Sequence, residues 1–387
     1  MPEVTPRPLA ELTTLRVGGI PRRLIEVTSR DEAIDVLRDT WNSGEDVLVL
    51  GGGSNLFVGD DDLELTVVRL RNEGIAVVGS PTPGVVRVRV EAGHEWDAFV
   101  AWTVQAGLAG VEALSGIPGT VGAAPVQNIG AYGQEVVQTL HEVELIDAAT
   151  GDVTPEPAAS LGLGFRTSVL KAHYGSVAER DAVILSATFD LRAVGTEPVA
   201  VAGEQLRQAL QLADDALISL AEIRDTVLAT RASKGMVLNP DDPDTYSAGS
   251  FFQNAVVPES FVRTLPAECP RGLMPGVAEV ADRVIGLDEY DGVLQPVIHT
   301  ERLFKVSNAW LIESVGVKRG FRFPGSRAGL STKHALALTN RGGARAEELA
   351  ELARYNRGRE PSEYGHHMEP DTIMVGVDIS AEGGAMK

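Results

Sequence analysis

The stretch "SGIPGTVGAAPVQNIGAYG" at residues 115–133 is the least ordinary part of this 387-residue chain, because it is rich in glycine and uncharged. Glycine weakens helices and strands alike, so the stretch cannot form an ordinary element of either kind. A long loop in a compact domain is either functional or disordered. The apolar residues in this stretch favour order, so we expect an ordered loop with a function.

A second glycine-rich stretch, "VLVLGGGSNLFV" at residues 47–58, closes a pattern of strand, helix and strand. Ser29 and Glu32 form a capping box that predicts where the helix begins. Three glycines directly after a strand let backbone amides approach a phosphate, although a tight turn would explain them too. The spacing matches neither a Rossmann fingerprint nor an NTPase P-loop. Two glycine-rich loops together suit a long ligand with a central pyrophosphate, such as FAD.

Strand and helix patterns alternate through the rest of the chain, which predicts an α/β fold class. Residues 85–93 alternate apolar and basic side chains as a half-exposed strand does, and residues 95–107 follow as a helix. A second capping box, Ser219 with Glu222, begins another helix. Residues 238–250 are rich in proline and aspartate, which indicates a crossing between domains.

The overall composition excludes several classes of protein. With 44% hydrophobic and 23% charged residues, the chain is neither disordered nor membranous, and no apolar run approaches the ~18 residues of a membrane-spanning helix. The first residues show no basic start before an apolar core, so no export signal is expected and a cytoplasmic location is the simplest interpretation. The net charge of -20 argues against a nucleic-acid partner, whereas small anions remain acceptable where cations converge.

Disulfide and metal chemistry are not expected. The single cysteine, Cys269, excludes an intrachain disulfide and a cysteine-built metal site. His366 and His367 are adjacent, so they point to opposite sides of an extended chain, and no third ligand is evident. We therefore predict no metal.

Three further stretches carry side chains suited to acid, base or anion chemistry. In "LGFRTSVLK", Arg166 is either a surface arginine or a guanidinium that holds a carboxylate bidentately. In "MEPDTIMVG", Glu369 and Asp371 are two residues apart, and exposed carboxylates of this kind are usually solvated. In "SAGSFFQN", Ser250 either caps a turn or moves a proton.

Seven stretches in a fixed order resemble the UDP-N-acetylenolpyruvoylglucosamine reductase family, whose members are also called UDP-N-acetylmuramate dehydrogenases. They run from residue 12 to about residue 376 and are "LTTLRVGG", "GGGSN", "LSGIPGTVGAAPVQNIGAYG", "FRTSVLK", "AGSFFQN", "AWLIE" and "HALALTNRGGA". The long glycine loop and "AGSFF" are the most specific of them.

The resemblance implies a fold of three α/β (α+β) domains. By that likeness, residues 1–72 and 73–236 form two FAD-binding subdomains, which cradle the cofactor as vanillyl-alcohol-oxidase-like flavoproteins do. The C-terminal strand, within residues 365–387, is expected to join the second subdomain. Residues 237–364 are expected to form the substrate-binding domain.

The resemblance also implies an activity in peptidoglycan precursor synthesis. NADPH reduces the FAD, and the enolpyruvyl sugar nucleotide then takes the place of the nicotinamide. Hydride passes from flavin N5 to C3 of the enol ether, a proton is added at C2, and the product is UDP-N-acetylmuramate. The implied partner is therefore a UDP-sugar, with no nucleic acid or membrane, and the implied assembly is a monomer or weak dimer.

Catalytic roles follow from the same resemblance. Arg166 matches the arginine that holds the substrate carboxylate while charge grows on it, with Phe165 where the family has tyrosine. Ser250 matches the serine that protonates C2, and the two phenylalanines after it are expected to exclude water around it. By register, Asp371 stands where the family has its catalytic glutamate, and Glu369 is its rival. A carboxylic acid kept protonated by an apolar site could donate a hydrogen bond there.

Cofactor and substrate contacts are implied as well. Diphosphate binding falls to Lys234 and Asn254, and Glu313 lies at a position used near the substrate. Ala202 stands where some members carry a substrate-binding tyrosine, and Tyr246 is a candidate substitute. The residues expected to bind FAD lie in the two glycine-rich loops: Gly51, Gly52, Gly53, Ser54, Asn55, Gly116, Ile117, Pro118, Gly119, Thr120, Gly122, Gln127, Asn128, Gly130, Ala131 and Tyr132.

Two alternatives stay open at this point. One is an FAD-dependent alcohol oxidase or dehydrogenase on the same cradle. Such an enzyme needs a base that removes a proton, whereas Arg166 and Ser250 suit proton donation. The other is a catalytically inactive nucleotide-binding homologue, which the replacement of glutamate by Asp371 would support.

Overall fold

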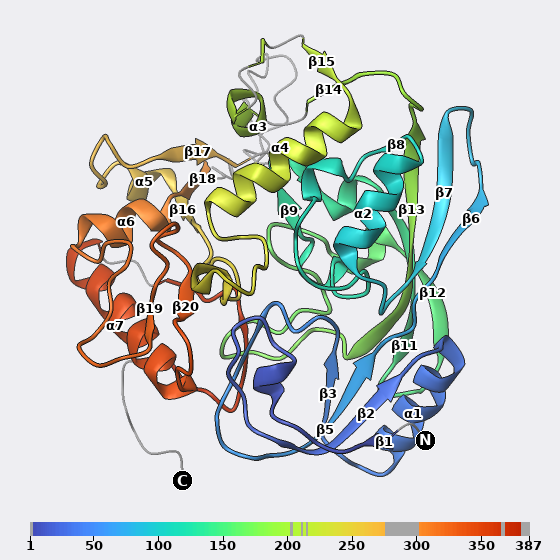
Figure 1. Ribbon diagram of the computed structural model, residues 1–387, viewed down its shortest axis with the longest axis horizontal. Helices are drawn as coiled ribbons and strands as arrows, with labels where there is room; N and C mark the ends of the chain where they lie inside the picture. The colour runs from blue at the N-terminus through green and yellow to red at the C-terminus, as the bar shows by residue number, and fades with distance from the viewer. Residues whose placement is uncertain are drawn as a thin grey trace, which may run out of the picture.

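Three groups of β-strands, contributed by successive parts of the sequence, organise the chain in this computed structural model (Figure 1). The structure describes residues 3–201, 204–209, 212–213, 216–274, 302–364 and 368–380. Strands and helices are mixed through all of these parts, which confirms the predicted fold class. Within these ranges no helix has the length and apolar character needed to span a membrane.

The first sheet has the strand order β1-β2-β5-β3 and lies at the bottom of Figure 1. β2 and β3 run parallel to β5, and β1 runs antiparallel to β2. Helix α1 (Arg30–Asn42) begins where the sequence predicts, since Ser29 Oγ accepts from Glu32 N at 3.3 Å. The Glu32 carboxylate accepts from Thr28 N, one residue before the cap. The strands span Glu3–Val4 (β1), Pro21–Val27 (β2), Val47–Leu50 (β3) and Leu63–Leu70 (β5).

The second sheet is antiparallel and follows the order β12-β11-β13-β7-β6, with β8 beside β13. Its core contains an aromatic cluster: Trp96 and Phe99 of helix α2 (Trp96–Gln105) pack on Phe189 of β13, with ring centroids 6.1 and 5.0 Å from that of Phe189. The strands span Ile75–Gly79 (β6), Val85–Glu91 (β7), Leu108–Ala109 (β8), Leu140–Asp147 (β11), Val153–Pro157 (β12) and Ala182–Ala193 (β13).

Helix α4 (Leu220–Ser233) follows the second sheet and packs on α2. The predicted capping box at Ser219 and Glu222 is complete, with the serine hydroxyl and the glutamate carboxylate each accepting from the other residue's backbone N–H. A short pair of strands and a short helix precede it: β14 (Val199–Ala200), β15 (Leu217–Ile218) and α3 (Glu204–Ala209).

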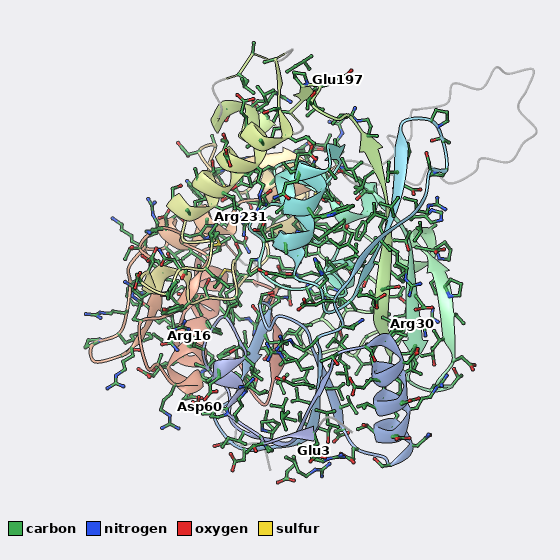
Figure 2. The ribbon with its side chains drawn as sticks, turned by 45° about the vertical axis from the view of Figure 1, so that its right-hand side comes forward. Glu3, Arg16, Arg30, Asp60, Glu197 and Arg231 are labelled. Atoms are coloured by element: carbon green, nitrogen blue, oxygen red, sulfur yellow. The ribbon has the colours of Figure 1, made fainter. Side chains whose placement is uncertain are left out.

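Helix α1 joins the first two sheets because it is buried between them. Ile34 and Leu37 share one apolar core with Ile25 of β2 and with Leu185 of β13. At the rim of this core, Arg30 binds Glu144 of β11 bidentately, at 2.7 and 2.8 Å, and Figure 2 shows Arg30 where the helix meets the second sheet.

The third group of strands lies on the left of Figure 1 and has its own core around helix α7 (Ala346–Tyr364). One antiparallel sheet has the order β16-β18-β17, and β19 pairs with β20. The other elements span Ala255–Pro258 (β16), Glu259–Val262 (α5), Arg271–Leu273 (β17), Leu303–Val306 (β18), Asn308–Ser314 (α6), Ala328–Leu330 (β19) and Leu338–Asn340 (β20).

The C-terminal strand does not pair where we expected. β21 (Ile373–Val375) runs parallel to β4 (Leu56–Val58), which belongs to residues 1–72 and not to the second subdomain. The physical reason is a backbone edge directly after the first glycine loop: Ile373 N donates to Asn55 O at 3.0 Å, and Gly59 N donates to Val375 O at 2.9 Å. The other domain limits stay a prediction.

Candidate active site

The two glycine-rich loops meet backbone to backbone. We call residues 51–55 loop 1 and residues 115–133 loop 2. A Cβ on Gly52 would lie 2.7 Å from Gly119 Cα, so only glycine allows this approach. Ser54 Oγ donates to Pro118 O across the same contact, at 3.0 Å. Loop 2 is thus ordered, as the sequence predicts.

Unpaired backbone amides gather at this contact. In the part of the chain that the structure describes, the N–H groups of residues 52–55 and 119–120 donate to no acceptor. Neighbouring free N–H groups on a glycine-rich backbone form a nest for an anion such as a pyrophosphate. The residues present therefore fit the central part of FAD. Gly116 differs, because its N–H donates to Asp97 Oδ1 at 2.6 Å.

Some predicted cofactor contacts hold the loops themselves. Asn55 Nδ2 donates to Gln127 Oε1 and to Asp371 O, both at 2.9 Å, so it ties loop 1 to loop 2 and to the C-terminal segment. Asn128 Nδ2 donates to Glu135 Oε2 and to Gly164 O, both at 3.0 Å. The side-chain amides of these two predicted cofactor residues therefore bond to the chain, and the contacts of both residues with FAD stay a prediction.

Loop 2 ends in a tight hairpin, with Tyr132 in its turn. Strands β9 (Gly130–Ala131) and β10 (Gln134–Glu135) pair antiparallel. Tyr132 and Gly133 between them have φ of 51° and 89°, the left-handed pair that a two-residue hairpin turn requires. The Lys234 ammonium lies 5.8 Å from the Tyr132 ring centre.

Arg166 also sits in a strained backbone conformation, with φ of 56°. The turn around it closes through Gly164 N, which donates to Thr167 O at 3.1 Å. Its guanidinium donates from Nη2 to Gly130 O at 3.2 Å, and its Nε lies 3.8 Å from Asp371 Oδ2. The Arg166 side chain therefore joins loop 2 to the side-chain carboxylate of Asp371. Arg166 is not a free surface arginine.

Asp371 is the buried one of the two candidate carboxylates. Lys171 Nζ donates to Asp371 Oδ1 at 2.8 Å, to Arg166 O at 3.0 Å and to Gln127 Oε1 at 3.2 Å. The side chains of Lys171 and Asp371 are only 2% and 11% exposed. Glu369 is exposed, and its carbonyl accepts from Gln253 N at 2.9 Å. The geometry therefore brings Asp371, and not Glu369, to Arg166.

The segment that carries Ser250 pairs with the segment that carries Asp371. Asp371 N donates to Phe251 O at 2.8 Å, and Phe252 forms an antiparallel bridge with Pro370. Ser250 itself is half-buried. Phe251 and Phe252 are buried in the α7 core, so they anchor the segment that carries Ser250. That they exclude water around Ser250 stays a prediction.

Matches to known families cover most of the chain. A family model described as FAD binding domain matches residues 21–154, and one described as UDP-N-acetylenolpyruvoylglucosamine reductase, C-terminal domain, matches residues 241–375. A relative from Leifsonia xyli named UDP-N-acetylenolpyruvoylglucosamine reductase is 45% identical, over 97% of this chain and 99% of its own. The chain belongs to the UDP-N-acetylenolpyruvoylglucosamine reductase family. A relative of the same name from Thermobifida fusca is 42% identical, over 96% and 98%.

A solved structure gives the same fold. The UDP-N-acetylenolpyruvylglucosamine reductase from Thermus caldophilus superposes with a TM-score of 0.60 at 22% identity, over 96% of this chain and 98% of its own. The resemblance seen in the sequence is thus confirmed, and so is an FAD-binding domain in an FAD-dependent oxidoreductase of the reductase family. An alcohol oxidase does not fit that family.

The predicted substrate-side residues are spread around the site. Lys234 is exposed at the end of α4. Asn254 Oδ1 accepts from the backbone N–H of Asn308 at 3.1 Å, so this residue holds the first turn of α6. Glu313 is paired with Arg319 at 3.1 Å. The structure does not bring these three side chains into contact with one another.

The candidate substitute Tyr246 is already engaged. Its hydroxyl donates to Pro240 O, and the Arg16 guanidinium lies 3.5 Å above its ring centre. Tyr246 therefore holds the crossing segment together, and its role as a replacement for the family's tyrosine stays a prediction. Ala202 lies outside the described residues.

Sequence reasoning missed several cations of the site. Lys171 carried a weak signal, being five residues after Arg166, whereas nothing local marks Lys305. The Lys305 ammonium lies 4.7 Å from the Phe165 ring centre. Burial and the repulsion of Arg166 lower the pKa of Lys305. Burial lowers the pKa of His334 to about 4, and Lys234 nearby contributes to this shift.

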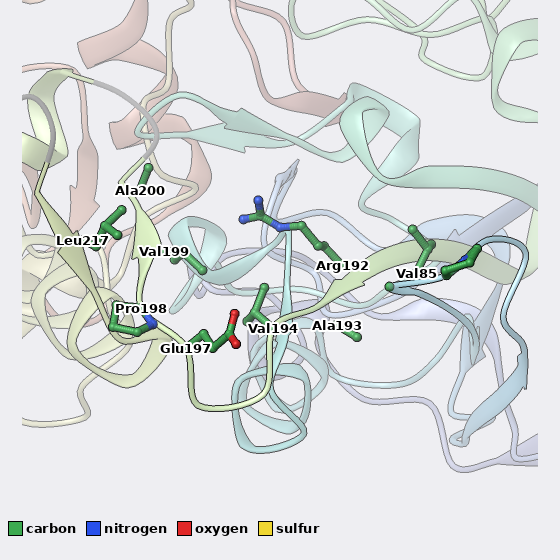
Figure 3. Close-up of a pocket in the computed structure, with 11 residues that line it drawn as sticks. Val85, Arg192, Ala193, Val194, Glu197, Pro198, Val199, Ala200 and Leu217 are labelled. Atoms are coloured by element: carbon green, nitrogen blue, oxygen red, sulfur yellow. The ribbon is translucent and has the colours of Figure 1, made fainter.

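A separate hollow lies away from these residues. A cavity of 590 Å³ is lined by the end of β13 and by β14. Figure 3 shows Arg192 and Glu197 among the residues that line it. None of the predicted site residues lines it. Among the described residues no group of three or more metal-ligating side chains comes together, and His366 and His367 lie outside those residues.

Proposed function

We propose that this chain reduces UDP-N-acetylglucosamine enolpyruvate to UDP-N-acetylmuramate, with NADPH as the electron source. The observation that carries the proposal is the convergence of Arg166, Ser250 and Asp371 from distant parts of the sequence, beside two loops with unpaired amides. Bound FAD would supply hydride transfer in two stages: it accepts a hydride from NADPH, and it then passes a hydride from N5 to C3 of the enolpyruvyl group.

Arg166 holds the substrate carboxylate. Hydride arriving at C3 moves negative charge through C2 into that carboxylate, so the transition state needs a cation in place before the reaction. Gly130 O and Asp371 fix two sides of the guanidinium, which sets its plane. Nη1 donates to no acceptor in the described part of the chain, and it is the donor left for the substrate.

Asp371 acts as an acceptor that orients Arg166. A protonated carboxylic acid could donate a hydrogen bond to the substrate, but both carboxylate oxygens here face cations, Lys171 on Oδ1 and Arg166 on Oδ2. This arrangement supports a positioning role for the carboxylate in the resting enzyme. The burial of Asp371 and the exposure of Glu369 support the assignment of this role to Asp371.

Ser250 delivers the proton to C2. A free serine hydroxyl is a weak acid, yet the carbon that it protonates becomes a strong base once hydride has arrived at C3, so geometry matters more than resting acidity. The Ser250 hydroxyl makes no hydrogen bond within the described chain, and the buried Phe251 and Phe252 fix its backbone. The hydroxyl is therefore free to point at a substrate carbon.

The UDP part of the substrate is held by Lys234 and Asn254, with Glu313 nearby. Lys305, whose ammonium lies over the ring of Phe165 next to Arg166, adds a further cation. A UDP-sugar and NADPH are metabolites of the cytoplasm, and we place the reaction there. A monomer or weak dimer stays a prediction.

The proposal is tested by anaerobic absorbance of the purified flavoprotein. NADPH is expected to bleach the flavin band, and the enolpyruvyl sugar nucleotide is expected to restore it with formation of UDP-N-acetylmuramate. Bleaching without recovery would mean a different acceptor or an inactive homologue. Bleaching of the flavin band by a simple alcohol in place of NADPH would instead support oxidase or dehydrogenase chemistry.

A further inference from the structure

Tyr174 joins the loop that carries Lys171 to the C-terminal segment. Its hydroxyl donates to Asp378 Oδ1 at 2.6 Å and accepts from Ile379 N at 3.2 Å. Ser380 donates to the same carboxylate, from its hydroxyl at 2.6 Å and from its backbone N–H at 2.8 Å. Hydrogen bonds from Ser380 and from Tyr174 lower the pKa of Asp378 to about 2. Asp378 is therefore a carboxylate at neutral pH, and the Tyr174 hydroxyl is the donor in their contact.

Two arginines of helix α7 hold the same C-terminal segment. Arg354 Nη1 donates to Asp378 O at 2.9 Å, and Arg357 Nη1 donates to Ile379 O at 3.1 Å. The Arg357 guanidinium also lies 5.2 Å from the ring centre of Tyr174, and that ring packs against the apolar core around α7. The Tyr174 side chain is therefore held by its ring as well as by its hydroxyl.

Tyr174 anchors the part of its loop that follows a local turn. In that turn, Leu170 N donates to Ser168 Oγ at 3.1 Å and Lys171 N donates to Ser168 O at 3.2 Å. Further along the loop the chain is open to solvent, and Val177 is 89% exposed. Tyr174, three residues after Lys171, thus fixes the loop between the turn and its exposed part.

Two contacts between the same two segments align them with each other. Lys171 Nζ donates to Asp371 Oδ1, and Tyr174 donates to Asp378, seven residues after Asp371. Two segments can pivot about a single contact, whereas a second contact at another point fixes their relative placement. Lys171 also donates to Arg166 O at 3.0 Å. The alignment therefore extends to the arginine that holds the substrate carboxylate in the proposed reaction.

We propose that Tyr174, through Asp378, is a positioning residue for the reaction. It keeps Lys171 in place against Asp371, and it thereby keeps Arg166 in the orientation that the transition state requires. Misplacing a catalytic group by about 1 Å can slow a reaction by up to about 100-fold. The inference rests on the proposed function for the step that is slowed, which is reoxidation of the flavin by the enolpyruvyl sugar nucleotide.

The test compares the holoenzyme variants Tyr174→Phe and Tyr364→Phe by anaerobic stopped-flow absorbance of the flavin. Tyr174→Phe keeps the ring but loses both bonds of the hydroxyl. The control Tyr364→Phe loses a hydroxyl contact of 3.1 Å with Ser314 Oγ, between α6 and α7. Reoxidation of Tyr174→Phe at saturating sugar nucleotide should be roughly 10- to 100-fold slower than in the wild type. Its reduction by NADPH, and both steps in the control, should keep the wild-type rates.

A second background separates positioning from a general loss of stability. In the double variant Lys171→Met with Asp371→Asn no ion pair is left to align, so adding Tyr174→Phe should not slow reoxidation further. Wild-type reoxidation in Tyr174→Phe alone would overturn the proposal. Equal slowing by Tyr174→Phe in both backgrounds would overturn it too, because the tyrosine would then act independently of the ion pair.

Hydrogen exchange tests the Tyr174–Asp378 contact without turnover. The backbone amides of Leu170 and Lys171 should exchange roughly tenfold faster in Tyr174→Phe than in the wild type or in Tyr364→Phe, because a charge-assisted hydrogen bond that restrains the loop is lost. If the wild-type flavin is reduced by NADPH but is not reoxidised by the sugar nucleotide, the proposed function fails. Faster exchange would then still support the alignment by Tyr174, and unchanged exchange would overturn it.

Discussion

Replacing Lys171 by methionine tests the buried ion pair at the centre of the site. The variant keeps the length of the side chain but leaves Asp371, with an 11% exposed side chain, facing only Arg166 at 3.8 Å. Removing one partner of a buried pair costs about 3–5 kcal/mol, because the remaining charge stays desolvated. We expect a loss of unfolding free energy near the lower end of that range, since Arg166 remains.

The measurement is urea unfolding of the purified protein at neutral pH, followed by circular dichroism. Lys318→Met, at an exposed position, is the control and should unfold like the wild type. The double variant Lys171→Met with Asp371→Asn removes the uncompensated charge, so it should be more stable than Lys171→Met alone. A loss below about 1 kcal/mol in the single variant, the value of an exposed pair, would refute the reasoning.

Other consequences can be checked in the same way. Gly52→Ala should weaken FAD binding roughly tenfold or more, because the added Cβ would lie 2.7 Å from Gly119 Cα. The control Gly79→Ala, whose added Cβ would have no atom within 4 Å, should bind FAD normally. Equal FAD affinities of the two variants in flavin titrations would contradict this prediction. His334 has its pKa lowered from 6.5 to about 4, chiefly by burial, so the unfolded chain takes up a proton that the folded chain does not as the pH falls through this window. Stability from this group is complete above pH 6.5 and should fall by roughly 3 kcal/mol towards pH 4, and His334→Gln should show a smaller fall in urea midpoints over the same range.

Local patterns in the sequence were enough to predict the elements that depend on local chemistry. Ser219 and Glu222 form their capping box because both partners lie within one helical turn. Loop 2 is ordered because its glycines allow close approach and because apolar residues such as Val121, Ala124 and Ile129 are buried. The family resemblance then supplied Arg166, Ser250 and Asp371, which the structure brings into one region.

Long-range pairing could not be predicted in the same way. The partner of β21 depends on a backbone edge more than 300 residues away, after loop 1, and no local pattern marks that edge. Lys171 resembles any lysine in a loop until the fold brings Asp371 to it. Likewise, an asparagine such as Asn128 can serve a ligand or its own chain, and only the positions of Glu135 and Gly164 decide between the two.

The most direct test of the central claim is a comparison of the two half-reactions in the wild type and in Ser250→Ala, by anaerobic stopped-flow absorbance of the flavin. The variant should be reduced by NADPH at close to the wild-type rate, because the serine takes no part in that step. Reoxidation by the enolpyruvyl sugar nucleotide should be slower by roughly 10²- to 10⁴-fold, the usual contribution of a positioned acid. Reoxidation of Ser250→Ala at the wild-type rate would contradict the account, because another group would then supply the proton.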